Sequence, residues 1–236
     1  MTKPAQPSSL GLRAIALLKE LSPENLEALA RDCAWRSFEE GQRIISRATS
    51  DRDLYFIVSG RVRVTTYSAT GKQVTFRDYG AGEHFGEVAA IDGLPRSADV
   101  LGLAPGLLAS LRPAVLQRLL KEEPTLANNL LRDFASLVRR LSERVVDLST
   151  LGVHQRLHAE LLRLAHEAGV KANCARLDPA PRHADLASQV STYREEVTRE
   201  LSLLAKRGVL GKEGRALLVR DVARLQKMVE EVKSGA

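Results

Sequence analysis

The chain has 236 residues, 44% of them hydrophobic and 27% charged, which is typical of a globular protein with one or two domains. Its net charge is +6, and the residues from His154 onward carry 15 Lys and Arg against 11 Asp and Glu, an excess that is compatible with nucleic-acid binding. No apolar run approaches the ~20 residues of a membrane span, and the first residues lack the apolar core of a secretory signal, so we expect no membrane attachment.

Cysteine and histidine usage argues against a disulfide framework or a metal centre. Cys33 and Cys174 are the only cysteines, and we interpret both as small buried side chains of a protein in a reducing cytoplasm. The five histidines show no spacing typical of Cys/His metal ligands, and His84 alone is a weak sign of haem or metal. We therefore expect no metal and no resident cofactor.

The first predicted elements are helical. We expect residues 1–11 to form a disordered tail, after which apolar residues recur from Leu12 with helical spacing. Ser22 then has the character of a helix N-cap and Pro23 that of a first helical residue, which predicts a helix over 25–33.

After this helical start the pattern changes to strands. The sequence is rich in Val, Ile, Tyr, Phe and Thr and is interrupted by glycines at short intervals. Around Val62 and Val64, polar residues such as Arg63 alternate with the apolar ones, which predicts a strand buried on one face. Short strands between repeated turns predict a small antiparallel sandwich or barrel that ends near Leu111.

One long helix is predicted next. The stretch between Pro124 and Gly152 contains no other Gly or Pro, and its apolar residues recur at steps of three and four. At about 1.5 Å per residue such a helix is roughly 40 Å long. Its apolar seam, flanked by charged residues such as Arg140 and Glu143, indicates a two-helix coiled coil between subunits, and a core helix that packs on its own domain is the alternative. Gly152 marks a hinge.

The last segment returns to short helices. An amphipathic helix over 156–168 is followed by a proline-rich break, and two short helices over 183–190 and 193–210 come next with a tight turn between them. The residues 211–221 then predict a two-stranded wing with its turn at Lys212-Glu213-Gly214. This order of elements is that of a winged helix-turn-helix.

The loop 82–98, GEHFGEVAAIDGLPRSA, has the residues of an anion site. Gly86 permits close approach of the backbone to a ligand, and the amides of the turn that follows can bind an anion. Arg96 and Ser97 suit phosphate oxygens, whereas Glu87 suits a sugar hydroxyl. One cation, one carboxylate and an apolar floor describe a cyclic nucleotide better than a triphosphate, for which no P-loop motif is present.

This loop also carries a specific resemblance. The stretch FGEVAAIDGLPRSA resembles the phosphate-binding cassette of cyclic-nucleotide-binding domains, and with the long helix and the winged helix-turn-helix the chain resembles the CRP/FNR family over roughly residues 12–225. The resemblance implies an α+β fold in which an antiparallel β-roll holds cAMP. It further implies that Glu87 binds the ribose 2′-hydroxyl and that Arg96 and Ser97 bind the cyclic phosphate.

The resemblance also places two hydroxyl-bearing residues of the long helix against the purine, one from each subunit. These positions correspond to Leu141 and Ser142, of which Leu141 departs from the Thr of the best-known cAMP binder. Because leucine cannot hydrogen-bond to the adenine amino group, cGMP becomes a candidate beside cAMP, although packing in the seam is the simplest role for Leu141. The candidate nucleotide-binding residues are Phe85, Gly86, Glu87, Val88, Ala89, Arg96, Ser97, Ala98, Leu141 and Ser142.

A second candidate site opens the predicted helix 193–210. Its spacing of Arg194, Glu195 and Arg199 resembles the recognition helix of catabolite activator proteins, which read a TGTGA-like half-site. Arginine can bond guanine O6 and N7 together, and glutamate can accept from cytosine N4. Charged residues that only decorate a solvated face are the alternative. Candidate contacts to phosphate are Ser191, Thr192, Tyr193, His183 and Lys212.

The sequence thus predicts a cyclic-nucleotide-responsive (cAMP or cGMP), homodimeric regulator that binds double-stranded DNA and RNA polymerase. The expected domains are a tail (1–11), the β-roll (12–122), the dimerisation helix and hinge (123–153), the winged helix-turn-helix (154–225) and a C-terminal tail (226–236). A regulator whose pocket takes another effector, or none, is the main alternative. An enzyme acting on cyclic nucleotides is disfavoured, because neither a metal nor an acid–base pair accompanies Glu87.

Overall fold

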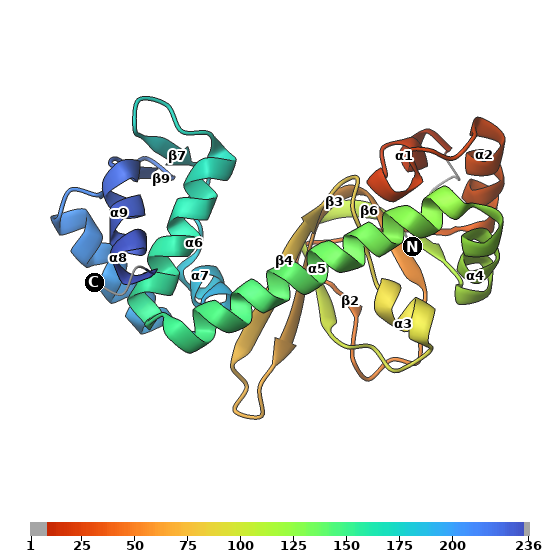
Figure 1. Cartoon of the computed structure of the whole chain (residues 1–236), viewed down its shortest axis with the longest axis horizontal. Helices are drawn as coiled ribbons and strands as arrows, with labels where there is room; N and C mark the ends of the chain where they lie inside the picture. The colour runs from red at the N-terminus through yellow and green to blue at the C-terminus, as the bar shows by residue number, and fades with distance from the viewer. Residues whose placement is uncertain (1–8, 234–236) are drawn as a thin grey trace. The chain divides into compact units, whose positions relative to one another are not determined.

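The computed structural model describes residues 9–233, which fall into two compact units (Figure 1). The first unit contains the chain up to Tyr67 together with residues 75–138, and the second contains Ser68–Val74 and the chain from Arg139 onward. The predicted tail 1–11 is helical from Ser9, where α1 begins (Ser9–Arg13), and its first eight residues lie outside the described part.

The first unit is built on an antiparallel sheet, as the sequence predicts. The strands run in the order β1-β6-β3-β4, with β2 also paired to β6 and β5 to β3. Their bounds are Ala34–Phe38 (β1), Arg43–Ile45 (β2), Leu54–Tyr67 (β3), Gln73–Gly80 (β4), His84–Phe85 (β5) and Asp99–Leu111 (β6). The pairing of β5 on β3 sets Phe85 opposite Tyr55, which fixes the loop 82–98 against the start of β3.

Helices gather at one end of this sheet, where Figure 1 shows α1, α2 and α4 beside one another. They are α1, the 3-10 turn Ala16–Leu18, α2 (Pro23–Asp32) and α4 (Pro113–Glu122), and a short helix α3 (Glu87–Asp92) follows β5. The hydroxyl of Ser22 accepts from the amide of Asn25, so the predicted cap and helix start are confirmed. The apolar faces of these helices form one core with the sheet, in which Leu12, Leu29 and Phe56 are fully or nearly fully buried.

One strand departs from the predicted alternation. Arg63 is only 5% exposed, although it was expected on the solvent face of β3, and Thr65, two residues further along the strand, is fully buried. The guanidinium of Arg63 donates from Nε and Nη2 to the two carboxylate oxygens of Asp78 on β4, at 2.7 and 2.8 Å. A buried charge is tolerated when such a bidentate partner satisfies it, and that partner lies on another strand.

Helix α5 (Pro124–Thr150) is the predicted long helix, and it contributes residues to both units. Only Leu126 and Leu130 are buried along its 27 residues. The apolar residues beyond them are exposed, with 61% of Val138, 63% of Val145 and 43% of Leu148 accessible. This exposure does not fit a helix that packs on its own domain. None of the helices within residues 9–233 has both the length and the hydropathy needed to span a bilayer.

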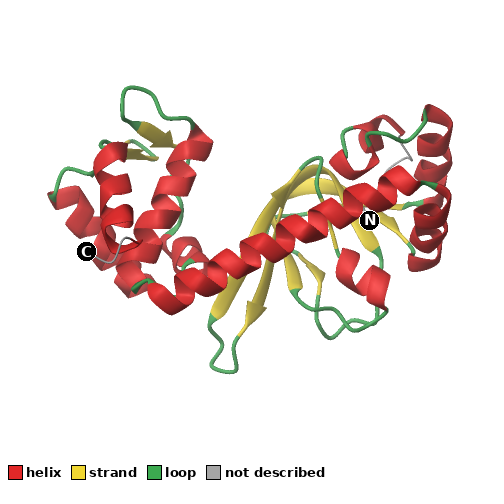
Figure 2. Ribbon diagram, viewed as in Figure 1, coloured by secondary structure: helices red, strands yellow, loops and turns green. Residues whose placement is uncertain are grey.

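The second unit is mainly helical and carries a three-stranded sheet (Figure 2). After a break at Leu151 and Gly152, its elements are α6 (Val153–Ala168), β7 (Ala175–Leu177), α7 (His183–Gln189), α8 (Arg194–Lys206), β8 (Leu210–Glu213), β9 (Ala216–Val219) and α9 (Val222–Lys233). The predicted helix-turn-helix is α7, its turn and α8, and the wing is β8 and β9. Their core is made by apolar residues such as Leu161, Leu186, Val197 and Leu204.

Two predictions for this unit are wrong. Residues 226–233 of the predicted tail are not a tail, since they belong to α9, which buries Val229. The last three residues lie outside the described part of the chain. Cys174 is exposed, whereas Cys33 is buried as predicted. The signal for α9 in the sequence is the helical spacing of its apolar residues. The wing separates α9 from the other helices along the chain.

Candidate functional site

The turn at Gly86 requires glycine for two reasons. Its φ angle is +87°, a conformation that side chains with a Cβ adopt rarely. A Cβ at this position would also lie 2.8 Å from Nη1 of Arg96 and 2.9 Å from the carbonyl oxygen of Asp53. The space that glycine leaves free is therefore occupied by the guanidinium of Arg96.

Arg96 is buried and held by acceptors on two segments. Only 4% of the residue is exposed. Its Nη1 donates to the carbonyl oxygen of Gly86 at 3.0 Å, and its Nη2 donates to Asp51 Oδ2 at 3.0 Å and to the carbonyl oxygen of Asp53 at 2.8 Å. Nε is buried too, and it has no hydrogen-bond partner among the described protein atoms. One edge of the guanidinium is thus fixed by the protein, and its Nε edge is left for another acceptor.

Asp51 is the centre of the network that fixes Arg96. Its Oδ2 also accepts from the hydroxyl of Tyr55 at 2.6 Å, and its Oδ1 accepts from the amide of Asp53 at 2.8 Å. Burial alone would raise the pKa of Asp51, but these hydrogen bonds and the charge of Arg96 together lower that pKa below its ordinary value. Asp51 therefore stays ionised and holds Arg96 in one orientation.

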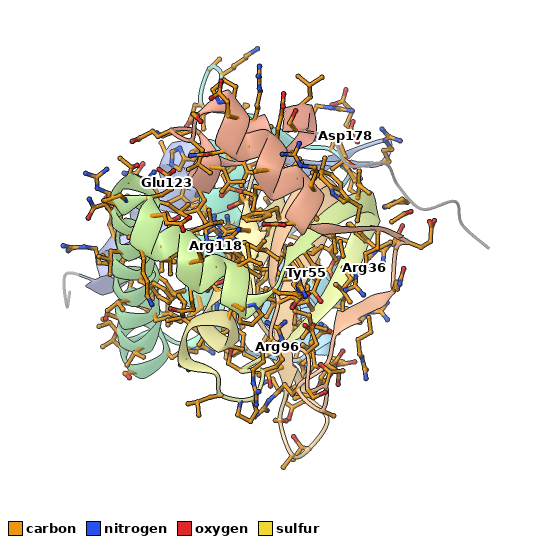
Figure 3. All side chains as sticks on the ribbon, turned by 90° about the vertical axis from the view of Figure 1, so that its right-hand side faces the viewer. Arg36, Tyr55, Arg96, Arg118, Glu123 and Asp178 are labelled. Atoms are coloured by element: carbon orange, nitrogen blue, oxygen red, sulfur yellow. The ribbon has the colours of Figure 1, made fainter. Side chains whose placement is uncertain are left out.

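Tyr55 connects this network to the apolar part of the loop. Its ring stacks on Phe85 with centroids 5.1 Å apart and an angle of 7° between the planes. The guanidinium carbons of Arg36 and Arg96 lie 5.1 and 5.6 Å from its centroid. Figure 3 labels these three side chains. Burial and the bond to Asp51 raise the pKa of the Tyr55 hydroxyl, which therefore remains a donor at neutral pH.

A cavity of about 60 Å³ is lined in part by Arg96. Its lining includes all eight residues predicted from the loop, which are Phe85, Gly86, Glu87, Val88, Ala89, Arg96, Ser97 and Ala98. Ile45, Val64, Tyr79 and Val100 from the strands complete a largely apolar floor. Pockets for small molecules usually measure at least ~300 Å³, so a nucleotide would have to widen this one on entry.

His84 directly precedes Phe85 of the cavity lining and is close enough to Glu87 to feel its charge. Its side chain is 12% exposed, and its Nε2 is 3.9 Å from Oδ2 of Asp133 on α5. Burial lowers the pKa of His84 below the ordinary value, although the charges of Glu87, Asp133 and Glu83 oppose this shift. The imidazole is therefore neutral at neutral pH.

The two remaining predicted nucleotide contacts lie elsewhere. Leu141 and Ser142 are both exposed on α5, with 41% of Leu141 accessible, and neither belongs to the cavity lining. Both residues belong to the second unit, whereas the cavity belongs to the first. Contact between these residues and a bound base stays a prediction.

The predicted DNA-reading residues open helix α8. Arg194 is its first residue, and Glu195 and Arg199 are exposed on the same helix. Arg199 is 72% exposed, and its Nη2 lies 3.3 Å from Oε1 of Glu196. The three predicted side chains line an open cavity of about 920 Å³ and keep their polar groups accessible.

The basic side chains of Arg194 and Lys212 lie near His183. His183 begins α7, and its Nδ1 is 2.7 Å from the hydroxyl of Thr198 on α8. Desolvation lowers the pKa of His183, and the charges of Arg194 and Lys212 lower it further. Three of the predicted contacts, from α7, α8 and β8, are therefore close enough to share one field.

The turn between α7 and α8 fits the prediction less well. Tyr193 is 61% exposed, but only 6% of Thr192 is exposed, and its amide donates to the carbonyl oxygen of Ala187. Ser191 has a φ of +55° at this turn, and its hydroxyl lies 3.4 Å from Nη2 of Arg144. Thr192 was predicted to contact phosphate. Its burial contradicts this prediction, because the protein covers its side chain within the turn.

Three functional residues were missed in the sequence. Asp51 and the carbonyl oxygen of Asp53 accept hydrogen bonds from Arg96, and the hydroxyl of Tyr55 donates to Asp51. The only sequence signal of these three residues is that alternate residues entering a strand share one face. Within residues 9–233, no group of three His, Cys, Asp or Glu side chains is arranged to hold a metal ion.

Comparison with known proteins matches two family models to separate stretches of the chain. The model of the cyclic nucleotide-binding domain family matches residues 35–123, and that of the Crp-like helix-turn-helix domain family matches residues 155–228. The cyclic AMP receptor protein of Thermus thermophilus is 29% identical over 222 residues, which cover 92% of this chain and 98% of that protein. The CRP-like cAMP-activated global transcriptional regulator of Mycobacterium tuberculosis is 25% identical over 92% of this chain and 97% of its own length. The solved structure of a CooA mutant from Carboxydothermus hydrogenoformans shares the fold, with a TM-score of 0.76 and 19% identity over 96% of this chain and 98% of that one.

Proposed function

This chain belongs to the CRP/FNR family of transcription regulators, and we propose that it is a homodimer whose DNA binding is switched by cAMP or cGMP. The chain carries the family's nucleotide-binding and DNA-binding domains, and its relatives are transcription regulators. As such a regulator it would act in the cytoplasm and contact RNA polymerase.

The buried Nε edge of Arg96 is the observation that carries nucleotide binding. Arg96 lines the cavity and is 4% exposed, and its buried Nε, which has no partner among the described protein atoms, is costly unless a ligand acceptor pairs with it. The cyclic phosphate would accept from this edge and from Ser97, while Glu87 would accept from the ribose 2′-hydroxyl. Phe85, Val88, Ala89 and Ala98 would contact the sugar and the base.

The exposed apolar residues of α5 support a dimer. Val138, Leu141, Val145 and Leu148 follow one another at steps of three and four, the spacing of a coiled-coil seam. A second copy of α5 would bury this seam and would place Leu141 or Ser142 of the two copies near the bound bases. A two-fold dimer would set its two α8 helices into successive major grooves of a palindromic TGTGA-like site, about 34 Å apart.

In this proposal Arg194, Glu195 and Arg199 read bases from α8. His183, Lys212, Ser191 and Tyr193 would contact phosphates. Bound nucleotide would shift the population toward the dimer in which both α8 helices can bind DNA, with the chain bending at residues 148–153.

A regulator that uses another effector is the alternative, and two observations favour it. The cavity of about 60 Å³ is small for a nucleotide, and Leu141 offers no hydrogen bond to a base. Under this alternative Arg96 would pair with a smaller anion, and neither cyclic nucleotide would change DNA affinity.

Calorimetric titration with cAMP and with cGMP tests the proposed ligand. One nucleotide should bind the wild type, and Arg96→Gln should weaken it on the order of 100-fold, because a charge-assisted pair is lost. A preference for cGMP would attribute a role in base selection to Leu141, whereas a preference for cAMP would leave Leu141 as seam packing.

Two further variants make this titration decisive. Arg118→Gln, an exposed arginine of α4 that pairs with Asp32, should bind as the wild type does. Ser97→Ala leaves the buried network of Arg96 intact and should cost roughly 10-fold. Binding of neither nucleotide to the wild type, or equal binding to Arg96→Gln, would favour the alternative.

A further inference from the structure

The open cavity of about 920 Å³ extends along the whole of helix α8. Its lining includes Arg194, the first residue of the helix, Lys206, the last, and Arg207 at the C-cap. At about 1.5 Å per residue, the 13 residues of α8 span about 20 Å. The DNA-reading residues predicted from the sequence occupy only the first two turns, so they do not account for the second half of this face.

The second half of α8 keeps the same face toward the cavity. Arg199, Ser202 and Lys206 follow at steps of three and four, so they share one side of the helix, and all three are exposed. The major groove of B-DNA is about 12 Å wide. The helix is thus longer than the groove is wide, and its last turn can contact the sugar-phosphate backbone while its first two turns read bases.

The hydroxyl groups in the middle of this face have no hydrogen to give to DNA. The hydroxyl of Thr198 donates to the carbonyl oxygen of Arg194 at 2.9 Å, and that of Ser202 donates to the carbonyl oxygen of Thr198 at 2.8 Å. A hydroxyl carries one hydrogen, and a phosphate diester oxygen only accepts. A phosphate beside the second half of α8 must therefore be bound by other side chains.

Lys206 and Arg207 supply donors at the far end of the cavity. Both residues are exposed, and their side chains form no ion pair or hydrogen bond with the residues that the structure describes. Arg199, by contrast, has Glu196 within 3.3 Å. A lysine ammonium has three donors and a guanidinium has five. Lys206 and Arg207 therefore keep all their side-chain donors for a ligand.

The charge of the cavity lining favours an anion at this end. Apart from histidine, the charged residues of the described lining are four basic and two acidic ones. Of the acids, Glu200 is 5% exposed, and its two carboxylate oxygens lie 2.7 and 2.9 Å from ring nitrogens of His158 and His154. Glu195 is exposed but belongs to the first turn of α8. The last turn thus contributes only positive charge to the described lining.

Cations at the end of a helix also have a purely structural role, because they interact favourably with the negative end of the helix dipole. Lys121 holds the corresponding place in α4, where it is the basic residue of the last turn. It is exposed, and it forms no ion pair with the described residues. Lys121 belongs to the first unit and does not line the cavity. The two lysines share the structural role, so a comparison between them isolates any role in DNA binding.

We propose that Lys206 and Arg207 form a backbone contact at the far end of α8, which binds a DNA phosphate beside the groove whose bases Arg194 and Arg199 read. The proposal rests on DNA binding by this domain, but it depends neither on the nucleotide switch nor on the half-site sequence. A phosphate contact releases condensed counterions. The contact therefore strengthens binding to every DNA sequence and makes this binding more sensitive to salt.

Salt titrations of DNA binding test this proposal. The affinity of the full-length protein for a labelled random-sequence duplex is measured by anisotropy between about 50 and 200 mM salt, with cAMP and cGMP both present. Lys206→Gln and Arg207→Gln should each weaken binding several-fold. Each should also make the slope of log affinity against log salt shallower by about 1 for every DNA-bound subunit.

Lys121→Gln is the matched control and should leave both the affinity and the slope unchanged. Thermal unfolding measures the structural role separately, and Lys206→Gln and Lys121→Gln should lose similar, small amounts of stability. An unchanged slope in Lys206→Gln or in Arg207→Gln, or an equally shallow slope in Lys121→Gln, would overturn the proposal. If the wild type binds the duplex and these variants match it, only this proposal fails. If the wild type binds no DNA, the proposed regulator fails with it.

Discussion

Asp51 Oδ2 and Arg96 Nη2 lie 3.0 Å apart, and this ion pair joins the start of β3 to the loop after α3. The two side chains differ in burial, with 35% of Asp51 and 3% of Arg96 exposed. Asp51 therefore holds a buried cation from the solvent side. A phosphate on the other side would find the guanidinium already oriented, which lowers the entropic cost of binding.

Replacing Asp51 with Asn should destabilise the protein and weaken nucleotide binding together. Loss of the charge leaves Arg96 with neutral acceptors only, for which we expect a cost of roughly 1–2 kcal/mol in free energy of unfolding. Saturating nucleotide should restore part of the loss, because the phosphate then compensates the guanidinium. Thermal unfolding with and without nucleotide measures both effects.

Asp32→Asn is the matched control for this prediction. Asp32 also pairs with an arginine, Arg118, but 55% of that arginine side chain is exposed. An exposed pair contributes about 0–1 kcal/mol, so this variant should be near neutral. Equal stability losses in the two variants would contradict the role given to Asp51.

Glu87→Gln tests the proposed contact to the ribose. The variant should lose roughly 10-fold in affinity for the nucleotide that binds, because an ionised acceptor is replaced by a neutral one. The 2′-deoxy analogue lacks the hydroxyl, so the wild type and the variant should bind it with similar, weaker affinity. Additive losses from the substitution and the missing hydroxyl would rule out contact between them.

Val145→Glu tests the dimer seam. Val145 is 63% exposed on α5, so the glutamate costs nothing in an isolated chain but would bury a charge between two copies. Sedimentation should show a shift from dimer to monomer, with dimer affinity weakened more than about 100-fold. Ser149→Glu, also exposed on α5, should leave the dimer intact. A wild type that is monomeric at every concentration would contradict the seam.

The acid sensitivity of the first unit should depend on His84. Burial lowers the pKa of His84, so the unfolded chain binds this proton more readily than the folded protein does. The stability that the neutral ring contributes is complete above the ordinary histidine value of about 6.5 and is lost as pH falls through the lower folded pKa.

His84→Gln should therefore lose less stability than the wild type between about pH 7.5 and pH 5.5. Urea unfolding at the two pH values measures the difference, and His166→Gln, which is exposed, serves as the control. A steeper loss in His84→Gln than in the wild type would show that the sign is wrong.

Local chemistry made much of the fold predictable. The Ser22 cap, the strands between glycines, the long helix without Gly or Pro and the start of α8 all follow from neighbouring residues. The loop 82–98 likewise brings its own eight predicted residues to one cavity, since they are contiguous or joined by one short helix.

The contacts that could not be predicted are those between residues distant in sequence. Arg63 is buried because Asp78 meets it across β3 and β4, and Arg96 is held by Asp51 from 45 residues away. Glu200 is buried because α6 supplies two histidines, a pairing that depends on how the helices pack. Strand and helix pairing decide these contacts, and the alternation of residues along one element does not contain that information.

DNA affinity with and without nucleotide tests the central claim most directly. The measurement is an anisotropy titration of a labelled palindromic duplex with two TGTGA-like half-sites, in the presence of cAMP, of cGMP or of neither. A nucleotide that favours the DNA-binding dimer should tighten binding about 5- to 150-fold, the usual range of allosteric coupling. Equal affinity in all three conditions would contradict the switch.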